Sequence, residues 1–155
     1  MKNKLILLVG CSGSGKSTFA KTYLDLDANQ YVNYISSDKL RGMIGKSEED
    51  QSVTCEVFNT IKSMVNEYLK NGADVMVDAT SLNLRERRDY LNTAKKYNVE
   101  TIAIVFERTK KQLMENQKKR GASGGRVVPE FVIDKMLSKY VRPSKEEGFF
   151  EVRLM

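Results

Sequence analysis

The sequence LILLVGCSGSGKST, from Leu5 to Thr18, decides the fold. It begins with a short, continuous apolar run that Gly10 ends, as is typical of a buried strand in a parallel sheet. Gly10 to Ser17 then matches the pattern G-x-x-x-x-G-K-[ST] without a gap. The glycines let backbone N–H groups point at a phosphate chain, and the helix that follows adds the positive end of its dipole. The stretch therefore predicts a nucleoside triphosphate site.

Each position of this loop has an expected role. Lys16 supplies a positive charge to the β- and γ-phosphates, and the Ser17 hydroxyl is a ligand for Mg²⁺. The alternative, a chance glycine-rich turn, does not explain the full spacing with a strand before it and a helix after it. The residues expected to contact the nucleotide are Gly10, Cys11, Ser12, Gly13, Ser14, Gly15, Lys16, Ser17 and Thr18.

Along the rest of the chain, apolar runs alternate with longer amphipathic stretches. Strands are predicted at 5–9, 31–35, 74–77, 101–106 and 149–154, and helices at 16–24, 38–44, 50–70, 84–97, 110–119 and 129–140. This alternation is typical of an α/β domain with a mainly parallel sheet. Ligands bind beyond the carboxyl ends of such strands, so the residues that follow strands, Gly10, Ser36, Asp78 and Glu107, are expected at one edge.

Composition limits the class of protein. The chain has 155 residues, of which 41% are hydrophobic and 30% charged, which predicts one folded domain over residues 1–155. No apolar run approaches the ~20 residues of a membrane span, and the first is too short for a signal peptide. A cytoplasmic protein with no membrane partner is expected. The net charge of +6 favours a polyanionic partner.

The supply of cysteine and histidine restricts the chemistry. The only cysteines are Cys11 and Cys55, and there is no histidine. Two cysteines without histidine do not make a usual structural zinc site, and both thiols are expected to be reduced. Without histidine, acid–base chemistry near neutral pH falls most naturally to a carboxylate.

Two carboxylates are candidates for chemistry. Asp78 ends the run DVMVD and is expected beside Mg²⁺, directly or through water, although it could instead cap a turn. Asp38 opens a predicted helix in ISSDKLRG, and Arg41 lies on the same helix face. Asp38 could deprotonate an attacking hydroxyl while Arg41 binds the acceptor's phosphate. An ordinary helix N-terminus with a serine cap and a solvated Arg41 fits equally well.

Basic residues gather in two further places. Arg120 and Arg126 flank a stretch of small residues, as expected of a mobile lid at about residues 116–129 that carries arginines onto a transferring phosphoryl group. The alternative is a basic surface loop. Arg85, Arg87 and Arg88 begin the helix after Asp78 and could bind a polyanion or form a solvated helix face.

The absence of other motifs narrows the class of nucleoside-triphosphate-binding enzyme. GTPases usually carry an N-K-x-D motif after a later strand, and none is visible. Motor ATPases are usually larger and assemble into rings. A kinase acting on a small group is the economical interpretation.

The combined motifs resemble the P-loop 5′-hydroxyl polynucleotide kinase family, the kinase domain of phage and bacterial polynucleotide kinase-phosphatase end-healing enzymes. The resemblance spans nearly the whole chain. It rests on GCSGSGKST, SSDKLRG, DQSVT at Asp50–Thr54, VDATSLNLRERR at Val77–Arg88, KKRG…RVVP and EEGF at Glu146–Phe149. It implies an adenylate-kinase-like three-layer P-loop domain with a small mobile lid. It also implies transfer of the γ-phosphate of ATP, with Mg²⁺, to the 5′-OH end of RNA or DNA.

The resemblance implies catalytic and binding roles at matching positions. The implied catalytic residues are Lys16, Asp38 as the general base, Arg41 on the acceptor's phosphate, and Arg120 from the lid. Lys16, Arg120 and Arg126 would contact the donor, and Ser17 and Asp78 the metal. The implied acceptor-binding residues are Asp38, Arg41, Asp78, Arg85 and Arg88.

The sequence departs from the family in two respects. Asn116 stands in the lid where arginine is expected, which affects the donor contacts. No phosphatase or ligase domain accompanies the kinase motifs, so a separate protein is expected to process 3′ ends. Two rival functions stay open: a small-molecule kinase for a nucleoside, sugar or antibiotic, and a nucleotide-gated nucleic-acid-binding module. The sequence also leaves open the choice of RNA or DNA and whether the chain forms a homo-oligomer.

Overall fold

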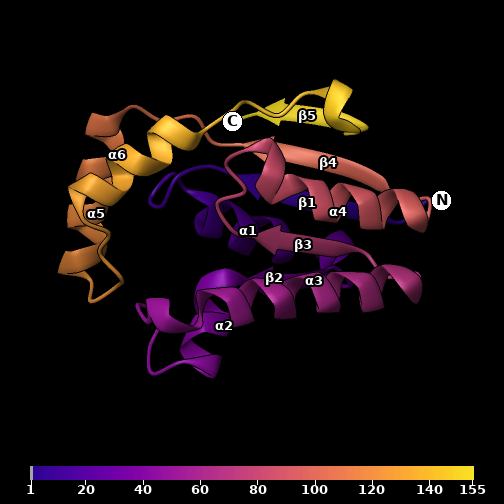
Figure 1. Ribbon diagram of the computed structural model, residues 1–155, viewed down its shortest axis with the longest axis horizontal. Coiled ribbons are helices and arrows are strands. Elements are labelled where there is room, and N and C mark those ends of the chain that lie inside the picture. The colour runs from indigo at the N-terminus through magenta and orange to yellow at the C-terminus, as the bar shows by residue number, and fades with distance from the viewer. Residues whose placement is uncertain (1) are drawn as a thin grey trace.

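The computed structural model describes residues 2–155, which form a five-stranded sheet with helices on both faces (Figure 1). All neighbouring strands are parallel, in the order β2-β3-β1-β4-β5. The strands are β1 (Lys4–Val9), β2 (Asn33–Ser36), β3 (Val75–Asp78), β4 (Glu100–Val105) and β5 (Glu151–Leu154). The α-helices are α1 (Lys16–Leu24), α2 (Ser37–Ile44), α3 (Thr54–Lys70), α4 (Leu84–Lys96), α5 (Lys110–Ala122) and α6 (Glu130–Lys139). The predicted mainly parallel α/β fold is confirmed.

Strand β1 is central because its apolar run can be buried on both faces. Leu5 to Leu8 pair with Val75 to Asp78 of β3, and Lys4 to Val9 pair with Glu100 to Val105 of β4. In β2, Ser36 is in register with Asp78. The carboxyl ends of β1, β2 and β3 therefore meet at one edge of the sheet, where the loops that follow them carry the candidate residues.

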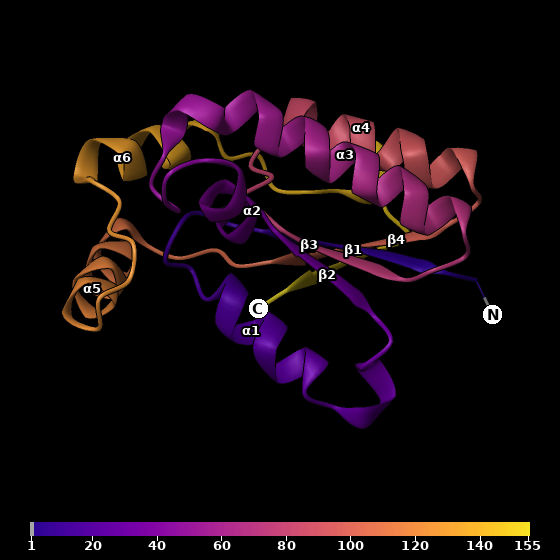
Figure 2. The same ribbon diagram turned by 90° about the horizontal axis from the view of Figure 1, so that it is seen from below.

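Helix α1 lies on one face of the sheet, and α3 and α4 lie on the other (Figure 2). Two apolar layers hold these helices to the sheet. Because side chains alternate along a strand, Leu5, Leu7 and Val9 face α3 and α4, while Ile6 and Leu8 face α1. On α3, the fully buried residues Val57, Ile61 and Val65 recur at helical spacing. Helix α1 contributes Ala20, with Phe19 and Tyr23 packed beside it.

Helices α5 and α6 lie together at the carboxyl edge of the sheet (Figures 1 and 2). A third apolar cluster joins them to the loop Gly10–Ser17, called the phosphate loop below. The cluster consists of Cys11, Leu82, Leu113, Val128 and Ile133. Helix α5 begins with a capping box in which Thr109 and Gln112 exchange side-chain-to-backbone hydrogen bonds. The pair α5–α6 thus forms a rim above the loop.

Most predicted element boundaries lie close to the observed ones, with two instructive differences. Strand β2 begins at Asn33 rather than Tyr31, because Val32 N–H closes a turn onto Asn29 and Tyr31 is exposed. Helix α5 runs to Ala122 rather than to residue 119. The first part of the stretch of small residues between Arg120 and Arg126 is therefore helical. Gly124, with φ of 79°, follows the helix in a left-handed conformation that favours glycine.

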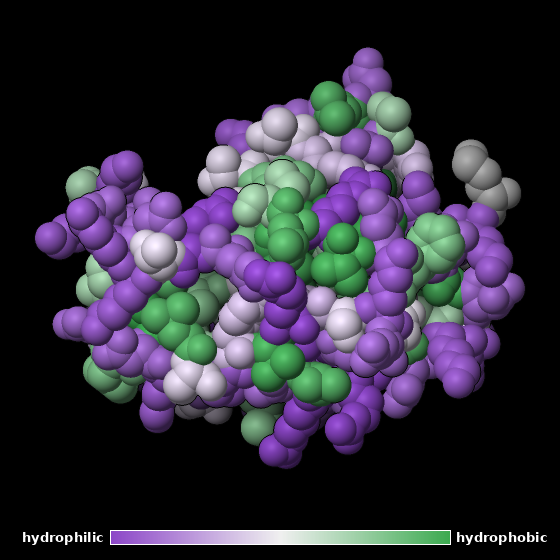
Figure 3. Space-filling model, turned by 90° about the horizontal axis from the view of Figure 1, so that it is seen from above, coloured by the Kyte–Doolittle hydropathy of each residue, from purple (hydrophilic) through white to green (hydrophobic). Residues whose placement is uncertain are grey.

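The face of the molecule drawn in Figure 3 is largely hydrophilic. Figure 3 shows a face on which hydrophobic side chains form separate groups among hydrophilic ones. Exposed apolar residues next to or within β5 include Phe150, Leu154 and Met155. Over residues 2–155, no helix combines the length and the apolar character needed to span a bilayer.

Candidate active site

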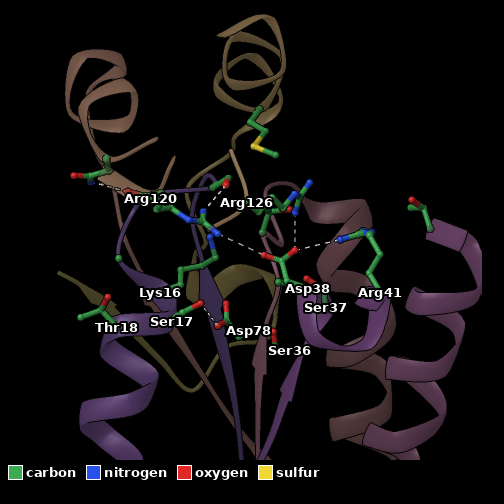
Figure 4. A pocket seen from close by; sticks show the side chains of 18 of the residues that line it. Lys16, Ser17, Thr18, Ser36, Ser37, Asp38, Arg41, Asp78, Arg120 and Arg126 are labelled. Atoms are coloured by element: carbon green, nitrogen blue, oxygen red, sulfur yellow. Dashed lines mark hydrogen bonds and ion pairs between the residues drawn. The ribbon is translucent and has the colours of Figure 1, made fainter. Parts of the chain in front are cut away.

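A cavity of about 610 Å³ opens at the carboxyl edge of the sheet, between the phosphate loop, α2, α3 and the α5–α6 pair (Figure 4). It brings together residues far apart in sequence. Of the predicted site residues, it is lined by Ser12, Gly13, Gly15, Lys16, Ser17, Thr18, Asp38, Arg41, Asp78, Arg120 and Arg126. Gly10, Cys11 and Ser14 are buried beneath the lining.

The loop has the backbone shape that an anion cradle needs. Gly13 and Gly15 have φ angles of 84° and 103°, which favour glycine. A Cβ at Gly13 would also lie 2.7 Å from Nε2 of Gln117. Lys16 Nζ donates to the carbonyl oxygens of Gly10 and Cys11 at 2.8 and 2.9 Å. Burial lowers the pKa of Lys16, so a phosphate here would offset the cost of burying its charge.

Ser17 and Asp78 form a small cluster of oxygen ligands. Ser17 Oγ donates to Asp78 Oδ2 at 2.8 Å, and the hydroxyl of Tyr34 donates to the same oxygen. Burial and the neighbouring Asp78 raise the pKa of Tyr34, which keeps it a hydrogen-bond donor. A hydroxyl and a carboxylate suit Mg²⁺, which takes few protein ligands and completes its shell with water and phosphate oxygens. The chemistry of this pair therefore fits the expected metal.

Asp38 is surrounded by arginines (Figure 4). Its Oδ1 accepts hydrogen bonds from Arg126 Nη1 at 2.6 Å and Arg41 Nη1 at 3.2 Å. Arg120 Nη2 lies 3.9 Å from Oδ2. Ser36 caps α2 by accepting from the N–H of Lys39, so the serine cap of the alternative interpretation is present, although its solvated Arg41 is not. The cap positions Asp38, whose carboxylate points into the cavity.

Arg41 is not a solvated surface residue. It is 5% exposed, and its Nε is a buried donor without a hydrogen-bond partner among residues 2–155. Burial and the nearby charge of Arg126 lower the pKa of Arg41. A buried donor that lines a cavity and lacks a partner indicates space for a ligand acceptor such as a phosphate oxygen.

The cavity as a whole carries an excess of positive charge. Its cationic side chains outnumber its carboxylates by six to three: Lys16, Arg41, Lys119, Arg120, Arg126 and Lys139 against Asp38, Asp78 and Glu86. Lys16, Arg41 and Asp78 are buried and thus poorly screened by solvent. The arrangement suits a strongly anionic ligand.

Helix α5 supports the phosphate loop through three residues, of which the sequence did not single out Gln117. Gln117, which is 2% exposed, donates from Nε2 to Ser12 O at 3.0 Å and accepts at Oε1 from Val128 N–H at 2.9 Å. Asn116 donates to Gly13 O at 2.7 Å, and Arg120 donates to Ser12 Oγ at 3.0 Å. Asn116 thus binds the loop at the position where arginine was expected.

Gln117→Met is expected to lower the free energy of unfolding by about 1–3 kcal/mol, because it leaves a buried carbonyl and a buried N–H without partners. It should also weaken ATP binding several-fold, since the loop loses a support. Thermal unfolding and a nucleotide titration check both effects. Lys118→Met, at an exposed position of the same helix, should change neither. Unchanged stability in Gln117→Met would contradict the assigned support.

One expectation about the basic residues was wrong. Arg87 does not join a polyanion-binding face, because it is fully buried and donates to Glu147 Oε1 at 2.8 Å and Ser81 O at 2.9 Å. Glu107 follows β4 at the carboxyl edge of the sheet, as expected, but it does not line the cavity. It accepts from Tyr140 at 2.5 Å and Arg142 at 2.6 Å, and so anchors the segment after α6.

Arg85 and Arg88 are both exposed on α4 and lie outside the cavity lining. Arg85 lines a second cavity, whereas Arg88 lines neither of the two. The two cysteines are both free thiols. Cys11 is buried in the loop Gly10–Ser17, and Cys55 is exposed on the first turn of α3.

Among residues 2–155, histidine, cysteine, aspartate and glutamate form no cluster of three or more that could hold a metal.

Comparison with known proteins gives consistent matches. A family model described as "AAA domain" matches residues 5–143. The L-seryl-tRNA(Sec) kinase of Methanococcus maripaludis is 28% identical over 141 residues, covering 90% of this chain and 53% of that protein. A putative bifunctional polynucleotide phosphatase/kinase of Acanthamoeba polyphaga mimivirus is 27% identical over 155 residues, covering 97% and 32%.

Among solved structures, a chain of the Pnkp1/Rnl/Hen1 RNA repair complex superposes with a TM-score of 0.75 and 29% identity, covering 89% of this chain and 44% of that one. The chain thus spans about half the length of the first relative, and less of the other two.

Proposed function

The chain belongs to the AAA domain family, whose model matches residues 5–143, and from this premise we propose that it is an ATP-dependent polynucleotide 5′-hydroxyl kinase. It would transfer the γ-phosphate of ATP to the 5′-OH end of RNA or DNA. The observation that carries the proposal is the position of Asp38, whose carboxylate faces the phosphate loop amid Arg41, Arg120 and Arg126. A base and anion-binding groups beside a donor loop are what transfer to a phosphate-bearing alcohol requires.

The geometry suggests how the residues would divide the work. Arg126 and Arg41 hold Oδ1 of Asp38, which leaves Oδ2 to accept the proton of the attacking hydroxyl. The spare Nε of Arg41 would bind the phosphate on the 3′ side of the acceptor's first nucleotide. Lys16 would turn from the carbonyls of Gly10 and Cys11 toward the transferred phosphate. Catalysis would consist of positioning and charge stabilisation.

The metal and the lid complete the proposed site. Ser17 and Asp78 would hold Mg²⁺, which when bound neutralises charge on the β- and γ-phosphates. Residues 116–129 would act as the lid, and Arg120 and Arg126 would approach the donor from it. Arg126, which is paired with Asp38, could then bind either Asp38 or the phosphates of the donor. We place the protein in the cytoplasm.

The names of the three relatives described above are compatible with a polynucleotide acceptor. Two of the three carry polynucleotide phosphatase/kinase or RNA repair complex in their names, and the third is a kinase of seryl-tRNA. The excess of cations in the cavity also favours an anionic acceptor. A small-molecule kinase of the same fold is the rival.

The direct test uses γ-labelled ATP and Mg²⁺ with short 5′-OH RNA and DNA, their 5′-phosphorylated counterparts, and a panel of nucleosides and sugars. We expect label on the 5′-OH strands and none on the phosphorylated counterparts. Label on a nucleoside or sugar alone would refute the polynucleotide acceptor while keeping the kinase.

Salt dependence gives an independent prediction. The KM for a 5′-OH oligonucleotide should rise steeply with salt, by about 0.7 in log KM per log unit of salt for each phosphate contacted. A neutral acceptor would show no such slope. Steady-state kinetics at several KCl concentrations, with the ATP concentration kept saturating, measure it. A flat profile would contradict a polyanionic acceptor.

A further inference from the structure

A second cavity, of about 320 Å³, lies beside the first and is not used by the proposed transfer. It is formed by α3, α4 and the end of α6, and Figure 2 shows α3 and α4 side by side on the same face of the sheet. Phe58, Glu86 and Lys139 line both cavities, so the two are contiguous. A volume of this size accommodates one nucleotide-sized group.

One residue of the second cavity's wall carries a polar group that the protein itself leaves unpaired. Tyr90 lines it and is 3% exposed, and its hydroxyl has no hydrogen-bond partner among residues 2–155. Burial raises the pKa of Tyr90, so the hydroxyl keeps its proton and can both donate and accept. Buried polar groups are nearly always paired, and one without a partner at a cavity wall indicates a ligand atom.

The other walls match the chemistry of a nucleotide. Phe58 offers a ring on which a base can stack. The charged residues of the lining are Lys62, Arg85, Lys139 and Glu86, three cations against one carboxylate. Lys62 is paired with Asp89 at 2.7 Å, and Lys139 lies 3.8 Å from Glu86. Arg85, in contrast, makes no ion pair or side-chain hydrogen bond within residues 2–155, which leaves its guanidinium for a phosphate.

We propose that the second cavity binds the second nucleotide of the acceptor strand, with its base against Phe58 and Tyr90 and the phosphate on its 3′ side at Arg85. This inference rests on the proposed function and names the substrate class more narrowly: a strand of at least two nucleotides. The strand would pass from Asp38 along the shared wall of Phe58, Glu86 and Lys139. The proposal gives Arg85 a contact with the acceptor strand and gives Arg88 none, because only Arg85 lines the second cavity.

The test compares acceptors of increasing length. The wild type is assayed with γ-labelled ATP on adenosine 3′-phosphate and on 5′-OH RNAs of two, three and six nucleotides. We expect kcat/KM to rise about tenfold from one nucleotide to two or three and then to level off, the scale of one base stacked on an aromatic ring. Tyr90→Phe and Arg85→Ala should each reduce that ratio about three- to tenfold. Lys95→Ala, a loss of charge on an exposed position of the same helix, should keep it.

Binding and thermal stability test the role of the Tyr90 hydroxyl without an activity assay. Tyr90→Phe should bind a fluorescent 5′-OH trinucleotide about three- to tenfold more weakly in fluorescence anisotropy, yet keep or raise the melting temperature, because it removes a polar group that the fold leaves unpaired. A lower melting temperature would mean that the hydroxyl serves the fold and would overturn the assignment.

The outcomes separate this inference from the proposed function. Equal kcat/KM on one and three nucleotides would overturn the second-nucleotide site and leave the polynucleotide kinase intact. Transfer to none of these acceptors would refute the proposed function and the site with it. A length dependence that Tyr90→Phe and Arg85→Ala leave unaltered would place the second nucleotide elsewhere on the protein.

Discussion

Asp38→Asn is expected to lower kcat for phosphoryl transfer by about 10³-fold, the scale of a lost general base. The amide keeps the size of the side chain and can still accept a hydrogen bond at one oxygen, but it cannot take the proton of the attacking hydroxyl. Arg41 and Arg126 would lose their common carboxylate partner, so the cavity would become more positive.

This variant separates catalysis from binding. ATP affinity should stay within about threefold, and affinity for a 5′-OH oligonucleotide should stay equal or increase, because one negative charge has left the cavity. Label transfer and equilibrium binding are measured on the same preparation, with Asp25→Asn, at an exposed position, as control. A wild-type rate of phosphoryl transfer in Asp38→Asn would show that Asp38 is not the general base. Wild-type protein that binds both ligands without transferring label would instead support a nucleotide-gated nucleic-acid-binding module.

The second large effect concerns stability. Arg87→Met should lower the free energy of unfolding by about 3–5 kcal/mol, because it leaves a buried carboxylate without its partner. The side chains of Arg87 and Glu147 are 0% and 6% exposed and share two hydrogen bonds, at 2.8 and 3.1 Å. The pair joins α4 to the 3₁₀ helix Lys145–Glu147, which precedes β5.

Urea denaturation followed by circular dichroism measures the effect. Arg88→Met, on the next and exposed residue, should change stability by less than about 0.5 kcal/mol. Arg87→Met combined with Glu147→Gln should cost less than the sum of the two single changes, because the second change removes the charge left alone by the first. Additive losses would show that the two side chains do not act as a pair.

The local parts of the site were predictable from sequence because each is encoded within a few neighbouring residues. The loop from Gly10 to Ser17 carries its own pattern, and Asp38 and Asp78 follow apolar runs that end at the same sheet edge. The spacing of Asp38 and Arg41 indicated a shared helix face, and the two side chains are in contact.

The rest depends on contacts between distant segments. Gln117 is an ordinary polar residue of a helix until α5 is placed against the loop, 105 residues away in sequence. Arg87 resembled its neighbours Arg85 and Arg88, and only the burial of one helix face distinguishes it. Glu107 does follow a strand, yet Arg142, 35 residues later, binds its carboxylate. The one sequence signal at Gln117 was its position four residues after Leu113, which places both on the same face of α5.

The unequal burial of the two thiols has a practical consequence. Burial raises the pKa of Cys11, which leaves it a weak nucleophile beneath the loop, whereas Cys55 is exposed. A maleimide dye should therefore react with the unmodified protein at one position. That position adjoins Thr54, part of the wall opposite the phosphate loop. The native chain thus supplies its own attachment point for a fluorophore that reports when an acceptor arrives.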